Sequence, residues 1–125
     1  MVEQHLDIMY FSGLIRFVGS DQFEIVRSNI LDDLNRHERT LEKIVSEAHY
    51  SDSDRLHHKL SGFAKQFGFR KLMGYLDLGF KKSCELTPSV AEQCQDEIAR
   101  LKIIVANIDL FISDHPHDDR RYISE

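Results

Sequence analysis

Proline, cysteine and tryptophan are scarce in this chain, which has two prolines, two cysteines and no tryptophan among its 125 residues. Only six residues are glycine, so few positions force regular structure to end. Cys84 and Cys94 are not spaced as Cys-x-x-Cys, which excludes the usual zinc and dithiol motifs. We therefore interpret both cysteines as reduced packing residues.

Long apolar runs and an excess of positive charge are also absent. The apolar runs are only a few residues long, whereas a membrane span needs about 20. The segment 1–5 has neither the basic nor the apolar region of a signal peptide, so we expect a cytoplasmic protein. A net charge of −5 disfavours nucleic acid as a partner, because binding to phosphates needs a basic face.

Apolar residues recur every three or four positions along most of the chain, and no segment alternates with the period of two that a strand requires. The pattern predicts helices over about residues 6–18, 21–48, a segment ending near 67, 69–85 and 88–112. Short loops between amphipathic helices favour antiparallel neighbours. We predict an all-α fold, an antiparallel up-and-down four-helix bundle with an extra N-terminal helix. One domain would cover residues 1–112, followed by a polar, flexible tail over 113–125.

Capping residues mark several of the expected helix ends. Ser20 is expected to cap the second helix. Gly68 fits the left-handed position that ends a helix. Thr87 followed by Pro88 combines a capping hydroxyl with a proline at the first helical position, which predicts the start of the last helix.

His58 lies opposite the apolar side of the third predicted helix. At about 100° per residue, four apolar residues fall between about 140° and 200° from it, namely Leu56, Leu60, Phe63 and Phe67. Gly62 lies one turn after His58, close to the same face, although glycine costs about 1 kcal/mol relative to alanine inside a helix. An exposed histidine beside bare backbone indicates a place where a large partner docks.

The residues His58-x-Leu60-x-Gly62, with Gly68 ten positions after the histidine, resemble the motif of histidine-containing phosphotransfer (HPt) domains. The resemblance covers about residues 7–112. It implies a four-helix bundle with His58 as the phosphoacceptor on the second helix of the bundle.

The resemblance also implies a function and partners. His58 would accept a phosphoryl group from an aspartyl phosphate on one receiver domain and pass it to an aspartate on another. The expected partners are the receiver domains of a hybrid histidine kinase and of a response regulator. The chain has no GxxxxGK[ST] loop and is expected to be a carrier rather than a kinase. It needs no cofactor of its own, since Mg²⁺ is expected on the receiver, and it is expected to be a monomer.

The sequence departs from the family pattern beside the histidine. The usual lysine three residues after the phosphoacceptor is Ser61 here. Lys65, at about −20° from His58, is placed to supply the missing charge, and Lys59 flanks the same face. We therefore predict that Lys65, Ser61 and Lys59 contact the phosphate. Gly62 and Arg55 are predicted to contribute to partner docking.

Another departure concerns the orientation of the imidazole. Relatives often place a polar side chain near this ring from the following helix, and the corresponding residue here is Phe80. Together with Ser61, it motivates a second hypothesis, in which the chain is a non-phosphorylated module that binds and modulates a receiver domain or another signalling protein.

The remaining histidines have simpler interpretations. His57 falls nearer the apolar stripe and is predicted to lie in a helix interface with a structural role. His37 lies on the stripe of the second helix and is interpreted as a histidine at the edge of the core. A third hypothesis, a metal-binding bundle, rests on the ligand types in segment 115–119, although solvated residues of a tail explain them as well.

Overall fold

The computed structural model describes the chain except residues 1, 49, 51–52, 81–85 and 114–125, and it describes residues 78–80 by their backbone only. The part of the chain described is all-α. Its elements are η1 (Val2–Gln4), α1 (Ile8–Val18), α2 (Ser20–Glu47), α3 (Asp54–Phe67), α4 (Arg70–Phe80), α5 (Pro88–Ala106) and α6 (Ile108–Ser113). The prediction of an all-helical fold is confirmed for these residues.

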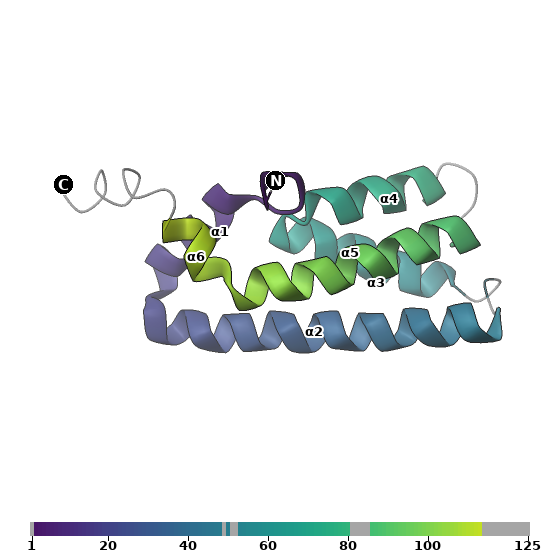
Figure 1. Cartoon of the computed structure of the whole chain (residues 1–125), viewed down its shortest axis with the longest axis horizontal. Helices are drawn as coiled ribbons and strands as arrows, with labels where there is room; N and C mark the ends of the chain where they lie inside the picture. Colours follow the sequence, from purple (N-terminus) through teal and green to yellow (C-terminus); the bar gives the residue numbers. More distant parts are fainter. Residues whose placement is uncertain (1, 49, 51–52, 81–85, 114–125) are drawn as a thin grey trace.

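The long helices lie along the longest axis of the molecule (Figure 1). The helices α2, α3, α4 and α5 run in alternating directions along this axis, and α2 spans its whole length. The closest packing occurs between α2 and α5, between α5 and α4, and between α4 and α3. The helix α1 packs on the beginning of α2.

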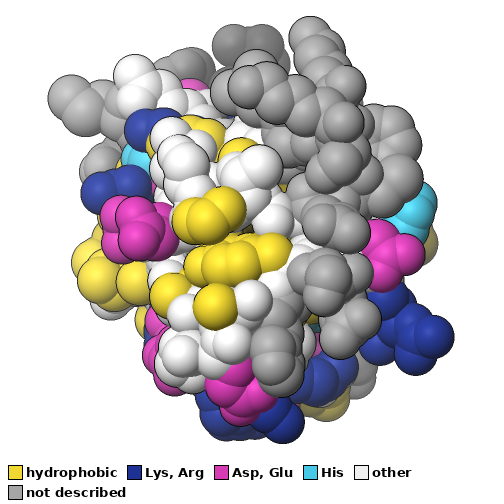
Figure 2. Space-filling model, turned by 90° about the vertical axis from the view of Figure 1, so that its right-hand side faces the viewer, with side chains coloured by type: hydrophobic (Ala, Val, Ile, Leu, Met, Phe, Trp, Pro, Cys, Tyr) yellow, Lys and Arg dark blue, Asp and Glu magenta, His cyan; other side chains and the backbone are white. Residues whose placement is uncertain are grey.

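The core lies between these helices and is almost entirely apolar. Its largest fully buried side chains come from every long helix and from the segments that join them, and are Phe11, Phe23, Phe69, Leu6, Ile30, Leu34, Leu41, Leu60, Leu72, Leu76, Leu86 and Ile98. Figure 2 views the end of the molecule where α2 ends and α5 begins. Hydrophobic side chains gather near the centre of this face and charged ones lie around it.

The turn between α3 and α4 depends on Gly68. Its φ of 67° and ψ of 35° confirm the predicted left-handed helix end. Its carbonyl accepts a hydrogen bond from the Asp7 amide at 3.1 Å, and a Cβ at this position would lie 3.1 Å from the Asp7 Cβ. Glycine is therefore required both by the backbone conformation and by the close approach of the N-terminal segment.

Two predicted helix starts compare differently with the structure. At α5, the Thr87 hydroxyl accepts from the Val90 amide at 3.2 Å, which confirms the predicted cap. At α2, the prediction was wrong, since Gly19 is the cap and Ser20 is already helical. The φ of 86° at Gly19 is accessible mainly to glycine, so this residue turns the chain directly from α1 into α2.

The predicted helix over 88–112 is broken, because α5 ends at Ala106 and α6 follows. The side-chain amide of Asn107 donates to the Ile103 carbonyl at 2.8 Å, in addition to the Asn107 backbone amide, which donates to the same oxygen at 3.2 Å. Arg27 of α2 donates to the Ala106 carbonyl at 2.9 Å and pairs with Asp109 at 2.7 Å. These contacts hold the break against α2. The predicted extension of α4 to 85 and residues 114–125 of the predicted tail lie outside the described residues, whereas Ser113, the first residue of that tail, belongs to α6.

Candidate functional site

His58 lies on the exposed face of α3, as its position on the helical wheel predicts. On the opposite face, Leu60 is fully buried and Leu56 and Phe63 are each 7% exposed. This burial holds α3 in one rotational position against α4. The imidazole of His58 is therefore accessible on a helix whose other face is part of the core.

The neighbouring His57 is buried between α3 and α4, where it is 3% exposed. Its Nε2 lies 2.8 Å from the Leu76 carbonyl oxygen. A carbonyl only accepts, so Nε2 carries the proton and donates. The predicted structural role in a helix interface is confirmed, because this hydrogen bond links α3 to the middle of α4.

A surface cavity of about 270 Å³ lies beside His58, between α3 and α4. It is lined by His57, His58, Ser61, Lys65 and Asp77. The structure thus brings Ser61 and Lys65 together with His58, as the sequence predicts. The cavity contains a hydroxyl, an ammonium and a carboxylate around one exposed imidazole.

Asp77 is the residue of this cavity that sequence reasoning missed. The polar residue near the ring was sought at Phe80, whose side chain lies outside the described residues. Asp77 precedes Phe80 by one helical turn and follows the buried Leu76. A polar residue directly after a core leucine was the available signal. This signal could not be used without knowing that the Leu76 carbonyl lies within hydrogen-bond distance of His57.

Apart from its chain neighbours and the backbone of its own helix, Gly62 has no atom of the described residues within 4 Å of the position that a Cβ would occupy. Packing within the chain therefore does not require glycine here, in contrast to Gly68. Gly74 of α4 has the same open surroundings among the described residues, so packing against them does not require glycine there either. Bare backbone next to His58 leaves room for another molecule to approach.

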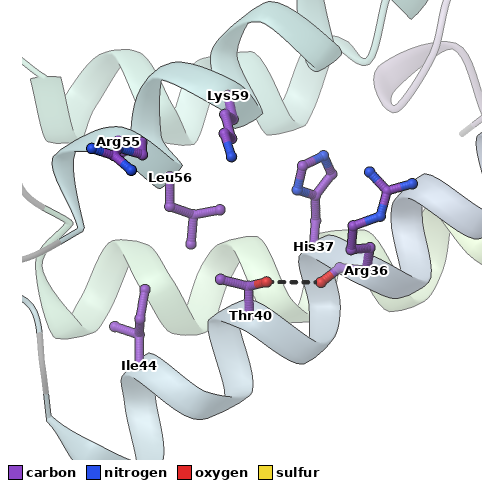
Figure 3. A pocket seen from close by; sticks show the side chains of 7 residues that line it. All are labelled: Arg36, His37, Thr40, Ile44, Arg55, Leu56 and Lys59. Atoms are coloured by element: carbon purple, nitrogen blue, oxygen red, sulfur yellow. Dashed lines mark hydrogen bonds between the residues drawn. The ribbon is translucent and has the colours of Figure 1, made fainter.

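The structure places Lys59 and Arg55 in a different cavity from Ser61 and Lys65. This second cavity has a volume of about 230 Å³ and lies between α2 and α3. Figure 3 shows the seven side chains that line it, which are Arg36, His37, Thr40, Ile44, Arg55, Leu56 and Lys59. The six predicted site residues are thus divided between the two sides of α3 and its exposed face.

His37 lies at the α2 wall of this second cavity. Burial lowers its pKa below the usual 6.5, the carboxylate of Asp33 acts in the opposite direction, and the positive charges of Arg36 and Lys59 lower it further. Its ring centroid lies 5.0 Å from that of Phe63 across the two helices. His37 thus lies at the edge of the core, as predicted, and its surroundings favour the neutral imidazole.

Groups suited to other chemistries are limited in the described part of the chain. Burial, with a smaller contribution from Glu97, raises the pKa of the Cys94 thiol to about 12, so this cysteine is a packing residue rather than a nucleophile. No three His, Cys, Asp or Glu residues in the described ranges are grouped to hold a metal ion. The candidate ligands of segment 115–119 lie outside those ranges. None of the helices described is long and apolar enough to cross a membrane.

Comparisons with known proteins return no match to a family model, to a curated protein or to a solved structure.

Proposed function

We propose that the chain is a histidine phosphotransfer protein of a multistep phosphorelay, with His58 as the phosphoacceptor. The observation that carries the proposal is the exposed imidazole on a rigid helix, beside a cavity that also holds Ser61, Lys65 and Asp77. The resemblance of the sequence around His58 to the HPt motif supports the same function.

The fold proposed with this function is an antiparallel up-and-down four-helix bundle of α2 to α5, with α1 as the extra N-terminal helix, in one domain over residues 1–112. The alternating helix directions in Figure 1 and the packing order α2, α5, α4, α3 support it. Such a bundle holds α3 firmly, so that a partner meets the phosphoacceptor in a constant position.

In the proposed reaction, one ring nitrogen of neutral His58 attacks the phosphorus of an aspartyl phosphate on a receiver domain. A nitrogen–phosphorus bond forms as the phosphorus–oxygen bond breaks, and the aspartate leaves as a carboxylate. The imidazole is transiently positive until its second nitrogen loses a proton. A second receiver reverses these steps with its own aspartate. Imidazole suits this role because much of it is unprotonated near neutral pH.

The cavity residues act on charge and access. The Lys65 ammonium attracts the oxygens of the phosphoryl group, and Ser61 offers them a hydroxyl donor. The Asp77 carboxylate favours the transiently positive imidazole and repels the finished phosphoryl group. Gly62 leaves clearance for the receiver next to His58. Phosphorylation would therefore be readily reversible, as a carrier requires.

The proposed partners are the receiver domains of a hybrid histidine kinase and of a response regulator, which meet the chain one at a time. The receiver supplies Mg²⁺ and the acidic residues that hold it, so the chain acts as a carrier without kinase activity. We also propose that the chain is cytoplasmic. We propose a monomer, because one exposed site must serve two partners in turn.

Asp77 also favours the alternative of a non-phosphorylated module. A carboxylate beside the acceptor and Ser61 in place of the usual lysine both oppose stable phosphorylation. A module of this kind would bind a receiver domain or another signalling protein and block it. It would keep its activity after His58→Gln, whereas a carrier would lose it.

Phosphoryl transfer from phosphorylated receiver domains to the purified chain tests the proposal. Wild type is compared with His58→Gln and with His37→Gln, a control histidine in the other cavity. We expect label on wild type and on His37→Gln that is lost in acid and stable in base, and none on His58→Gln. Binding of a receiver without any label on wild type would reject the carrier and favour the module.

A further inference from the structure

The cavity between α2 and α3 is a groove with an apolar floor and a basic rim, and the proposed phosphotransfer does not use it. In Figure 3, Ile44 and Leu56 extend into it from opposite walls, and Lys59 points into the space between the helices. The helices α2 and α3 are not among the closely packed helix pairs of the described structure. The backbones of α2 and α3 therefore do not pack closely, and side chains from both helices line the groove between them.

The charge of the groove is opposite to that of the whole chain. Arg36, Arg55 and Lys59 line it, and none of the described residues lining it is Asp or Glu. Asp33 pairs with Arg36 at 2.6 Å and compensates one of the three positive charges. The chain has a net charge of −5, so a concentration of positive charge at this one groove selects for a negatively charged partner.

The lining favours a protein segment over a small anion. The α2 wall is a helix interior, whose backbone amides are already used in helical hydrogen bonds, whereas Arg55 and Leu56 lie in the first turn of α3. The Thr40 hydroxyl donates to the Arg36 carbonyl at 3.0 Å. The side chains of Ile44 and Leu56, which lie between these walls, offer no hydrogen bonds to a small anion. An apolar side chain flanked by carboxylates fits both the floor and the rim.

We propose that this groove binds an acidic amphipathic helix of a partner protein. An apolar side chain of that helix would enter between Ile44 and Leu56, and its carboxylates would meet the basic rim. Arg55 and Lys59 are one helical turn apart, so carboxylates four positions apart on a helix alongside α3 reach both. A partner bound in this way would also lie next to His58. The binding itself does not depend on phosphorylation of His58.

The test is a titration of isotope-labelled chain with a synthetic helical peptide, followed by amide chemical shifts. The peptide carries Glu residues one turn apart around a single Leu, and a control peptide has Gln in place of Glu. We expect saturable shifts at Thr40, Ile44 and Leu56 with a Kd on the order of 1 mM, as befits one isolated element of an interface.

Two double variants locate the binding. Arg55→Glu with Lys59→Glu is expected to raise the Kd at least about tenfold, and both positions are exposed near the start of α3, where Glu suits the helix dipole. The matched control, Arg39→Glu with Lys43→Glu, changes two exposed residues of α2 that do not line the groove and should leave the Kd unchanged.

Other outcomes overturn the proposal. Absence of saturable shifts at the groove would reject the site, and equal binding of the Gln peptide would reject the role of charge. Pyrophosphate producing the same shifts with the same affinity would make it a simple anion site. Peptide binding by His58→Gln separates this result from the phosphotransfer test, because that variant keeps the groove and lacks the acceptor.

Discussion

The two cavities beside α3 differ in charge and in composition. The one toward α4 combines His58, Ser61 and Lys65 with the carboxylate of Asp77, so positive and negative groups balance. The one toward α2 has a basic rim over Ile44 and Leu56. The first arrangement suits a group that is bound and released, and the second suits recognition of a partner. On this difference we place the proposed phosphotransfer and the proposed partner binding on opposite flanks of the same helix.

The strongest test of this division is His58→Gln. We expect transfer of the phosphoryl group to fall to background, because glutamine offers no nucleophilic ring nitrogen. Peptide binding in the groove between α2 and α3 should remain within about twofold of wild type, measured by chemical shifts. Loss of both activities, with an unchanged melting temperature, would mean that the two cavities form one site.

The two glycines that follow His58 in the chain, Gly62 and Gly68, should respond to substitution in opposite ways. Gly68→Ala is expected to destabilise the fold by about 1–3 kcal/mol, because a Cβ meets Asp7 and φ is positive. Gly62→Ala is expected to stabilise it by about 0.5–1 kcal/mol, since its surroundings are open. Urea unfolding measures both effects. Gly13→Ala on α1, equally open, is the control.

Gly62→Ala also tests whether the proposed phosphoryl transfer takes place on this side of α3. If Gly62 provides clearance for a receiver, Gly62→Ala should slow phosphoryl transfer although it stabilises the fold. Gly13→Ala should stabilise the fold without slowing transfer. Equal transfer rates in the two variants would show that Gly62 provides no clearance that the reaction needs.

Opposite charges in the cavity beside His58 predict opposite effects on phosphorylation. Lys65→Met should reduce the equilibrium fraction of phosphorylated chain, and Asp77→Asn should increase it, each by about fivefold for an interaction of ~1 kcal/mol in a solvated site. The fraction is measured against one receiver domain held at constant concentration. Changes of the same sign would contradict the electrostatic roles proposed for these residues.

The smallest expected effect is the pH dependence that His37, in the groove between α2 and α3, gives to the free energy of unfolding. Its folded pKa lies below the unfolded value of 6.5, so the unfolded chain binds the proton more readily. The contribution of His37 to stability is thus complete above pH 6.5 and is lost as the pH falls through its folded pKa. Unfolding by urea between pH 7.5 and 5 measures this slope. His37→Gln should flatten the curve, and an unchanged slope would assign it to other groups.

Much of the fold followed from local patterns, and the errors at Asn107 and Asp77 arose where a tertiary contact decided the outcome. The Thr87 cap and the left-handed Gly68 were predictable because their hydrogen bonds and backbone angles are local. The break at Asn107 was not, because Arg27 of α2 binds the carbonyl of Ala106 across the structure. Asp77 was missed for a similar reason, since the rotation of α4 is set by its packing against α3.

The sequence by itself determined which residues lie on each flank of His58. At about 100° per residue, Arg55 and Lys59 fall at about 60° and 100°, whereas Ser61 falls at about −60°. Only the tertiary structure decided what each flank faces. The burial of Leu60 and Phe63 against the core turned one flank toward Asp77 of α4 and the other toward Arg36 of α2. Helical geometry is local, whereas the neighbour of a helix depends on which faces the whole chain can bury together.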